Sequence, residues 1–499
     1  MSIKSLAGQT LWYGVSSIAA RFINYLLTPI LTYSAIVTIA DFGRMSAVYA
    51  MMPLMNVLLT YGMETAYFRF IQNKEKTAII DSTASISLLL STAVFAVLLW
   101  LNQGLLIKIT ELKEFPVLVQ LSIFIIVMDA LSAIPFAKIR NEGRPRLFAL
   151  IKIIGIILYI GLTAFFVMYC PYEYNKNGGN SWVVLFYSPR TNPIVYVLIA
   201  NIFQSGVTLL LLLKWLLPKK FVFSFPVWKD MIVYAFPMLI AGLGYTVNET
   251  FDRLMLGWWL PPSVAKEQLG IYSACYKLAI LISLFIQAFR MGAEPFFFKQ
   301  AEGKDAPRTY ARVMKFFVLT ITLMFLVVVL YIPIWKYFIA PKYWEGLKVV
   351  PILLLANMSL GIYINLSIWY KITSRTWAGS IITMIGVAIT FSVNYLFIPR
   401  FSYVASAWAT FLCYSTMMVV SYIWGQKHYY IPYAWKKLLA FLVIVLLLFF
   451  IHKGITMLWS NTVFSLLVAT ILISLYAWFI VQVERKEFKL FPVIGKYIR

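Results

Sequence analysis

The sequence FGRMSAVY at Phe42–Tyr49 returns as LGIYSACY at Leu269–Tyr276, with Gly, Ser, Ala and Tyr at the same spacing. The copies lie 227 residues apart in a chain of 499 residues. A second echo joins Glu64 to Glu294, 230 residues later. In a chain that spans a membrane, duplicated halves are typical of transporters built from two bundles around a central site. The repeat therefore predicts two related halves with a site between them.

The composition is that of a membrane protein. Hydrophobic residues make up 62% of the chain and charged residues only 12%, whereas soluble domains carry about 25% charged residues. The net charge of +24 could indicate nucleic-acid binding. However, the basic residues lie in short loops between apolar runs and not in one basic domain. We therefore expect no nucleic-acid partner and a surface that faces lipid.

Apolar runs of about 20 residues are long enough to cross a bilayer as helices. Strands of a membrane barrel would be about ten residues long with alternating polarity, which these continuous runs lack. The sequence thus predicts an all-α integral membrane protein with about fourteen transmembrane helices. The predicted spans are centred near residues 12–36, 45–68, 80–101, 116–137, 147–168, 193–213, 231–258, 271–295, 313–335, 348–370, 377–397, 403–424, 438–456 and 461–482.

Lysine and arginine in the loops predict the orientation. With the N-terminus inside, 27 of the 43 basic residues fall on the inner side, 11 on the outer side and 5 within spans. Cytoplasmic loops of membrane proteins carry such an excess. We therefore expect both termini in the cytoplasm and an even number of spans.

The repeat and the spans together predict the domain organisation. Residues 1–213 form an N-terminal lobe of six spans, and residues 231–424 form a related C-terminal lobe of six spans. Residues 214–230 are a basic and aromatic cytoplasmic linker, typical of a segment that lies along a lipid surface. Residues 425–499 add two spans outside the repeat and a cytoplasmic tail.

Cysteine and histidine point to no metal or redox chemistry. The three cysteines, Cys170, Cys275 and Cys413, lie far apart and form no paired framework. His428 and His452 are too few and too isolated for a zinc site. We expect no metal and no cofactor.

Charged residues inside the spans are the candidate functional residues. A charge at the bilayer centre costs about 2.5–3.5 kcal/mol on insertion scales, so it normally faces a cavity or a partner. The predicted substrate-binding cations are Arg21, Arg253, Lys277 and Arg290. The predicted polar cavity residues are Asn24, Tyr25 and Asn248, and the candidates for ion coupling are Glu249, Asp252 and Glu64. Cations in such a cavity suit an anionic cargo, because arginine binds phosphate oxygens two at a time.

Structural roles compete with these assignments. Glu64 and Glu294 lie near the ends of their spans, where they would clamp the bundle. Glu249 and Arg253 are four residues apart and can pair along one helix, which alone would make insertion tolerable. The role of Asp129, on the fourth span, stays open. Nothing in the residues decides between a proton and a sodium ion as the coupling ion.

Four segments resemble a known family. They are DRLMLG at Asp252–Gly257, LGIYSACYKL at Leu269–Leu278, NYLFIPRF at Asn394–Phe401 and VASAWAT at Val404–Thr410. These segments are similar to those of the bacterial polysaccharide flippases, the O-antigen and exopolysaccharide unit translocases of the multidrug/oligosaccharidyl-lipid/polysaccharide (MOP) exporter superfamily. The family usually has glycines in the turn where this chain has Ser402 and Ala405.

The resemblance implies a V-shaped transporter of two lobes whose cavity alternates between the faces of the bacterial cytoplasmic membrane. The implied cargo is an undecaprenyl-pyrophosphate-linked oligosaccharide for polysaccharide or lipopolysaccharide biosynthesis. The implied partners are that lipid-linked oligosaccharide, membrane lipid, and a glycan polymerase with its assembly proteins. The last two spans would help to accommodate the lipid tail.

Two other functions compete with flipping. A MATE-like drug or metabolite antiporter would share the superfamily and the repeat. A membrane glycosyltransferase, polymerase or ligase would need catalytic groups on a sizeable outer loop. The longest outer loop, residues 169–192, offers only Glu173, Lys176 and Arg190 as charged groups. We therefore expect a transporter and not an enzyme.

Overall fold

The chain is an all-α membrane protein of about fourteen helices. A computed structural model describes residues 25–488, except 73, 179–180, 219, 302, 304, 374 and 460. Within these residues there is no strand, and thirteen helices are long and apolar enough to cross a membrane. The predicted fold class is confirmed. Most of the first predicted span, 12–36, lies outside the described residues, and its end is the helix α2 (Leu27–Tyr33).

The helices of the first half are α3 (Ile39–Thr60), α4 (Met63–Phe70), α5 (Thr77–Leu101), α6 (Gln103–Thr110), α7 (Pro116–Asn141), α8 (Pro145–Ala164), α9 (Cys170–Asn177) and α10 (Pro193–Leu216). Those of the second half are α11 (Phe225–Trp259), α12 (Pro262–Gln300), α13 (Ala306–Leu330), α14 (Ile332–Trp335), α15 (Val350–Leu366), α16 (Ile368–Ile372), α17 (Thr376–Phe401) and α18 (Tyr403–His428). The chain ends with α19 (Trp435–Leu458), α20 (Thr462–Val483) and α21 (Arg485–Phe488).

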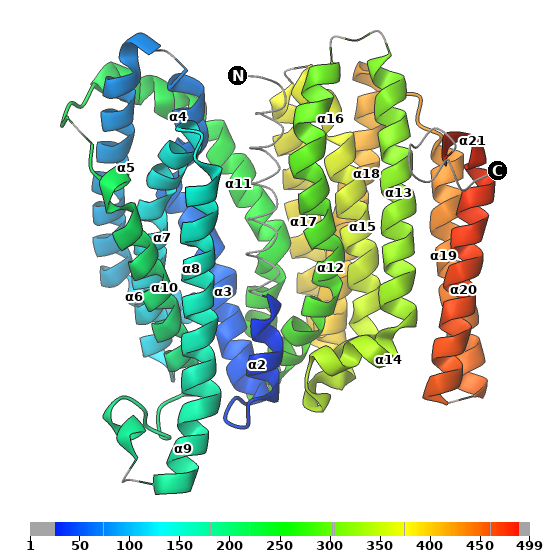
Figure 1. The fold of residues 1–499 in the computed structure, drawn as a ribbon, viewed down its shortest axis with the longest axis horizontal. Coiled ribbons are helices and arrows are strands. Elements are labelled where there is room, and N and C mark those ends of the chain that lie inside the picture. The colour runs from blue at the N-terminus through cyan, green and yellow to red at the C-terminus, as the bar shows by residue number, and fades with distance from the viewer. Residues whose placement is uncertain are drawn as a thin grey trace.

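Figure 1 shows these helices as two groups that stand side by side. Helices α5 to α10 lie on one side and α12 to α18 on the other, with α3 and α11 between them. Helix α3 contacts both α11 and α12, so the first half touches the second through its second predicted span. Helices α19 and α20 lie at the edge of the molecule and pack against α13.

The central helices are longer than their apolar windows predicted. Helix α11 starts at Phe225 and α12 at Pro262, whereas the predicted spans start at 231 and 271. A proline stands in the first turn of each helix, where its missing N–H costs nothing and its fixed φ favours a helix start. The apolar run in the sequence predicts only the part of a helix that lies in the hydrocarbon region, and each of these helices continues beyond that region.

The repeat glycines make the closest contact between the halves. A Cβ atom on Gly43 of α3 would collide with the backbone carbonyl oxygen of Lys266 on α12. A Cβ atom on Gly270 of α12 would collide with the backbone carbonyl oxygen of Ile39 on α3. Each glycine meets the residue that lies four positions before the other glycine. The two contacts are therefore copies of one contact, and only glycine allows the backbones this close. We call the end of the bundle at which α3 and α12 begin the gate end; it lies at the bottom of Figure 1.

The first copy of this helix is broken and the second is continuous. Helix α3 ends at Tyr61 (φ 36°) and α4 begins after Gly62 (φ 75°), both in the left-handed region. Left-handed backbone is rare for an aromatic residue. Helix α12 runs without a break from Pro262 to Gln300. The halves thus differ at this position, although they match at their gate-end glycines.

Acidic residues at the end of α20 attach the last two spans to the second half. The carboxylate of Glu484 lies 2.8 Å from the Nζ of Lys315 on α13 and 2.6 Å from the Nζ of Lys437 on α19. Glu487 lies 3.0 Å from the Nε of Arg312. The Glu484 side chain is only 3% exposed, so its ion pairs are shielded from water.

Replacing Glu484 with alanine should lower the free energy of unfolding by up to about 3 kcal/mol, because it removes a buried carboxylate that pairs with both Lys315 and Lys437 and leaves Lys315 with Glu487 at 3.2 Å. Asp305→Ala is the control. Asp305 and its ion-pair partner Arg308 are both exposed, and such pairs contribute at most about 1 kcal/mol. Denaturant unfolding of the purified protein in lipid measures both changes. Equal losses in the two variants would contradict the buried role of Glu484.

Candidate transport site in the second half

A buried carboxylate joins the two central helices of the second half. Asp252 of α11 is 2% exposed and accepts a hydrogen bond of 2.5 Å from the hydroxyl of Tyr272 on α12. It also accepts one of 2.8 Å from the backbone N–H of Arg253. A carboxylate inside a membrane protein needs such partners, because hydrocarbon offers none. These contacts hold α11 against α12.

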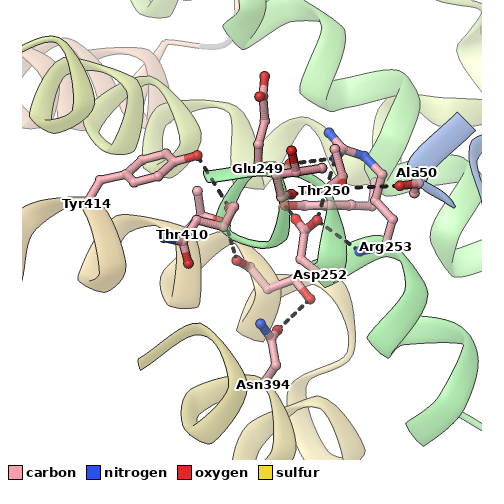
Figure 2. Close-up of polar contacts among 12 residues, drawn as sticks. Ala50, Glu249, Thr250, Asp252, Arg253, Asn394, Thr410 and Tyr414 are labelled. Atoms are coloured by element: carbon pink, nitrogen blue, oxygen red, sulfur yellow. Dashed lines mark hydrogen bonds and ion pairs between the residues drawn. The ribbon is translucent and has the colours of Figure 1, made fainter. Parts of the chain in front are cut away.

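Arg253 is held in place by three groups. Its Nη1 lies 3.5 Å from a carboxylate oxygen of Asp252 and donates a hydrogen bond of 2.8 Å to the backbone carbonyl of Glu249. Its guanidinium carbon lies 4.4 Å from the centre of the Tyr276 ring, a cation–π contact. The neighbouring carboxylate of Asp252 thus forms its ion pair, and Glu249, four residues away, contributes its backbone. In Figure 2 the side chain of Glu249 extends away from the contacts of Asp252.

Asn248 faces into the second half. It is 4% exposed, and its side-chain amide donates to the backbone carbonyl of Thr383 at 3.1 Å and accepts from the hydroxyl of Thr390 at 3.3 Å. The hydroxyl of Tyr414 donates to the Asn248 carbonyl at 3.3 Å. Both hydrogen-bonding ends of this side chain are therefore occupied by α17, and the residue ties α11 to α17 and α18.

Lys277 is the cation of this region without a visible partner. It lies half-buried on α12, one residue after Tyr276. Within the described residues it makes no ion pair or hydrogen bond, and Arg253 is close enough to repel it. Such a cation in a membrane is stable only beside water or an anion.

The remaining predicted residues lie elsewhere. Tyr25 is 7% exposed, and its ring stacks on Phe338 at 4.1 Å between centroids. Arg290 is exposed and lines a small recess near Lys371, toward the far end of α12 from the gate end. Glu64 forms an ion pair with Arg140 of α7. The predicted residues Arg21 and Asn24 fall outside the described residues.

The structure therefore brings together four of the predicted charges, which are Glu249, Asp252, Arg253 and Lys277. Two carboxylates and two cations leave this group formally neutral. An added proton, or an arriving anion, changes that balance. The group lies between α11 and α12, close to where α3 of the other half packs.

One contact across the halves had no signal in the sequence. The hydroxyl of Thr250 on α11 donates to the backbone carbonyl of Ala50 on α3 at 3.2 Å (Figure 2). Every residue has a backbone carbonyl, so the sequence cannot indicate which one accepts this hydrogen bond. Only the packing of the helices shows it. In the described part of the chain, no group of three His, Cys, Asp or Glu side chains could hold a metal ion.

Comparisons with known proteins agree with this architecture. Residues 6–300 match the family model described as polysaccharide biosynthesis protein. No curated protein matches the sequence. Among solved structures, the lipid II flippase MurJ in an inward closed conformation is similar, with a TM-score of 0.73 at 13% identity, over 94% of this chain and 98% of that one.

Multidrug transporters share the fold more distantly. A multidrug resistance MATE family transporter of the MOP superfamily, in an inward-facing conformation, has a TM-score of 0.56 at 14% identity, over 86% of this chain and 94% of that one. A MATE in the straight conformation has a TM-score of 0.58 at 14% identity, over 85% and 95%. At these identities the likeness shows the fold alone.

Proposed function

Because its family model matches residues 6–300, the chain belongs to the polysaccharide biosynthesis protein family, and we propose that it flips lipid-linked oligosaccharides across the bacterial cytoplasmic membrane. The chain is a multi-pass membrane transporter with the MOP-type fold. The proposed cargo is an undecaprenyl-pyrophosphate-linked oligosaccharide, moved from the cytoplasmic to the outer leaflet. The proposed partners are this cargo and a glycan polymerase with its assembly proteins. We propose no enzymatic activity and no cofactor.

The observation that carries the proposal is Lys277. Arg253 beside it already forms an ion pair with Asp252, whereas Lys277 forms no ion pair among the described residues. A pyrophosphate is the anionic part of the proposed cargo, and a hydrogen bond to a charged group contributes about 1.5–3 kcal/mol. Arg21 and Arg290 complete the set of cations that we propose for the cargo.

The contact of Gly43 and Gly270 supports alternating access. This contact closes the gate end, where α3 and α12 begin. From the excess of basic residues in the loops at the opposite end, we infer that the gate end faces the outer side of the membrane. We propose that cargo enters from the cytoplasm in this conformation and leaves when the gate end separates.

The acidic groups suit ion coupling by a proton or a sodium ion. The two candidates on α11 are Glu249 and Asp252, and the Asp252 carboxylate also binds Tyr272 and Arg253. Glu64, near the start of α4, forms an ion pair with Arg140 of α7. A structural role in holding α4 against α7 explains this residue.

The test is translocation of a polyprenyl-pyrophosphate-linked glycan by the full chain in proteoliposomes. Lys277→Ala should reduce the initial rate by about 10- to 150-fold, because it removes a contact of about 1.5–3 kcal/mol to the cargo. Lys277→Arg should keep most of the rate, since it keeps the charge. Lys113→Ala, an exposed cation at the gate end, is the control. An unchanged rate in Lys277→Ala, with normal insertion, would refute the assignment.

The MATE fold keeps a drug antiporter as the second candidate, because multidrug transporters share this architecture. The same proteoliposomes test it with a cationic dye. Dye export that depends on Glu249 and exceeds glycan translocation would favour the antiporter.

A further inference from the structure

A carboxylate in the first half lies outside the site described above. Asp129 stands thirteen residues after the start of α7 and twelve before its end, about 18–20 Å from each at 1.5 Å per residue. It is therefore at the middle of a membrane span. The residue is nevertheless exposed, although its hydrogen bond with Ser205 is part-buried between α7 and α10. A bare carboxylate does not face hydrocarbon, so Asp129 either lies in a wetted crevice or carries a proton.

The neighbours of Asp129 suit a proton. Its one hydrogen-bond partner among the described residues is Ser205 of α10, whose hydroxyl donates at 2.8 Å. Lys152 of α8 lies within electrostatic reach and packs over the ring of Phe136 at 4.2 Å. A metal ion would need several oxygen ligands and would be repelled by Lys152. A proton needs one oxygen, and a serine hydroxyl can donate to the charged carboxylate or accept from the neutral one.

A chain of polar side chains lies one helical turn away. The side-chain amide of Asn201, four residues before Ser205, donates to the hydroxyl of Tyr49 on α3 at 2.8 Å. The Tyr49 hydroxyl lies 2.7 Å from that of Tyr159 on α8. Among the described residues, the titratable or charged groups within electrostatic reach of Asp129 on the packed helices are thus Lys152 and Tyr49, and Tyr159 lies behind Tyr49.

The repeat shows that this cluster in the first half is equivalent in position to the site in the second half. Tyr49 is the last residue of FGRMSAVY, and Tyr276 is its counterpart in LGIYSACY. Tyr276 packs on Arg253, and Tyr49 belongs to the cluster near Asp129. Each half therefore has a polar cluster at the same repeat position. The next residue, Ala50, accepts the hydrogen bond of Thr250 from α11.

We propose that Asp129 binds and releases a proton, as a second ion site in the first half, and that Tyr49 and Ala50 on α3 connect this site to α11. This inference goes beyond the proposed function, because it concerns a different half and needs no cargo. The link between Asp129 and α11 rests on the positions of Tyr49 and Ala50, which are adjacent on α3. A test must therefore measure the proton and the conformation together.

The experiment uses the full chain in lipid. Infrared difference spectra between acid and neutral pH report protonated carboxyl groups. Spin labels on Lys113→Cys and Lys348→Cys, two exposed gate-end positions in opposite halves, report the gate-end distance. The three native cysteines are buried and should not be labelled. We expect Asp129→Asn to lose one carboxyl signal and the pH dependence of the distance, and Asp129→Glu to keep both.

Asp305→Asn is the control, since Asp305 is exposed and forms an ion pair with exposed Arg308. It should leave the carboxyl signal from the membrane region and the gate-end distances unchanged. If Asp129→Asn keeps the signal and the pH dependence, the proposal is overturned. If that variant does not fold, Ser205→Ala decides, because it keeps the carboxylate and removes its donor. In Ser205→Ala we expect the pH midpoint of the change in the carboxyl signal to move by about one pH unit. An unmoved midpoint overturns the proposal.

Discussion

Replacing Gly270 with alanine should separate α3 from α12 at the gate end. The new methyl group would collide with the carbonyl oxygen of Ile39, and a backbone cannot give way as a side-chain tip does. Overpacking of this kind costs about 1–3 kcal/mol, which lowers the ratio of closed to separated molecules by about fivefold to 150-fold. The spin labels at positions 113 and 348 measure this ratio as a second, longer distance. Gly43→Ala should give the same result, since it repeats the contact from the other half.

Gly161→Ala is the matched control for both variants. Gly161 lies in α8, and a Cβ atom there would meet nothing within 4 Å. It should leave the distance distribution of the wild type unchanged. A single short distance in both Gly43→Ala and Gly270→Ala would show that the repeat glycines do not hold the gate end closed.

Replacing Asp252 with alanine should destabilise the protein by about 3–5 kcal/mol. Removing one partner of a buried ion pair leaves the other charge uncompensated, and here it also leaves the Tyr272 hydroxyl without its acceptor. The loss should appear as a lower free energy of unfolding in lipid. Tyr272→Phe removes only one hydrogen bond to a charged group and should cost about 1.5–3 kcal/mol.

The double variant Asp252→Ala/Arg253→Ala separates charge from packing. Removing both charges of a buried pair is often close to neutral, so the double variant should recover part of the stability lost in Asp252→Ala. A double variant less stable than Asp252→Ala would mean that Arg253 does not depend on Asp252.

The spans were predictable because length and hydropathy act locally. The lipid environment requires about 20 apolar residues for each crossing, and every predicted span with described residues contains a helix. The repeat also predicted that Gly43 and Gly270 are equivalent. It did not show that they meet the carbonyl oxygens of Lys266 and Ile39, because such a contact depends on how α3 crosses α12.

The partners of the charges were harder to predict. Spacing along one helix predicted that Glu249 could pair with Arg253, but it gave no sign of the ion pair between Arg253 and the adjacent Asp252. The hydroxyl of Tyr272 reaches Asp252 only because α11 and α12 lie against each other. Likewise, Glu64 meets Arg140 across two helices that are far apart in the chain. Patterns within one helix cannot contain such information.

The break in α3 has a consequence for how the molecule moves. Two identical halves that rock about a shared contact would tilt by equal amounts. Here the first half can flex within its own membrane helix at Tyr61 and Gly62, while the continuous α12 must move as a rod. A left-handed tyrosine costs about 1–3 kcal/mol, a strain that straightening would release. One half of the duplicated transporter can therefore bend within its central helix, whereas the other moves as a rigid helix. The movements of the two halves are expected to be unequal.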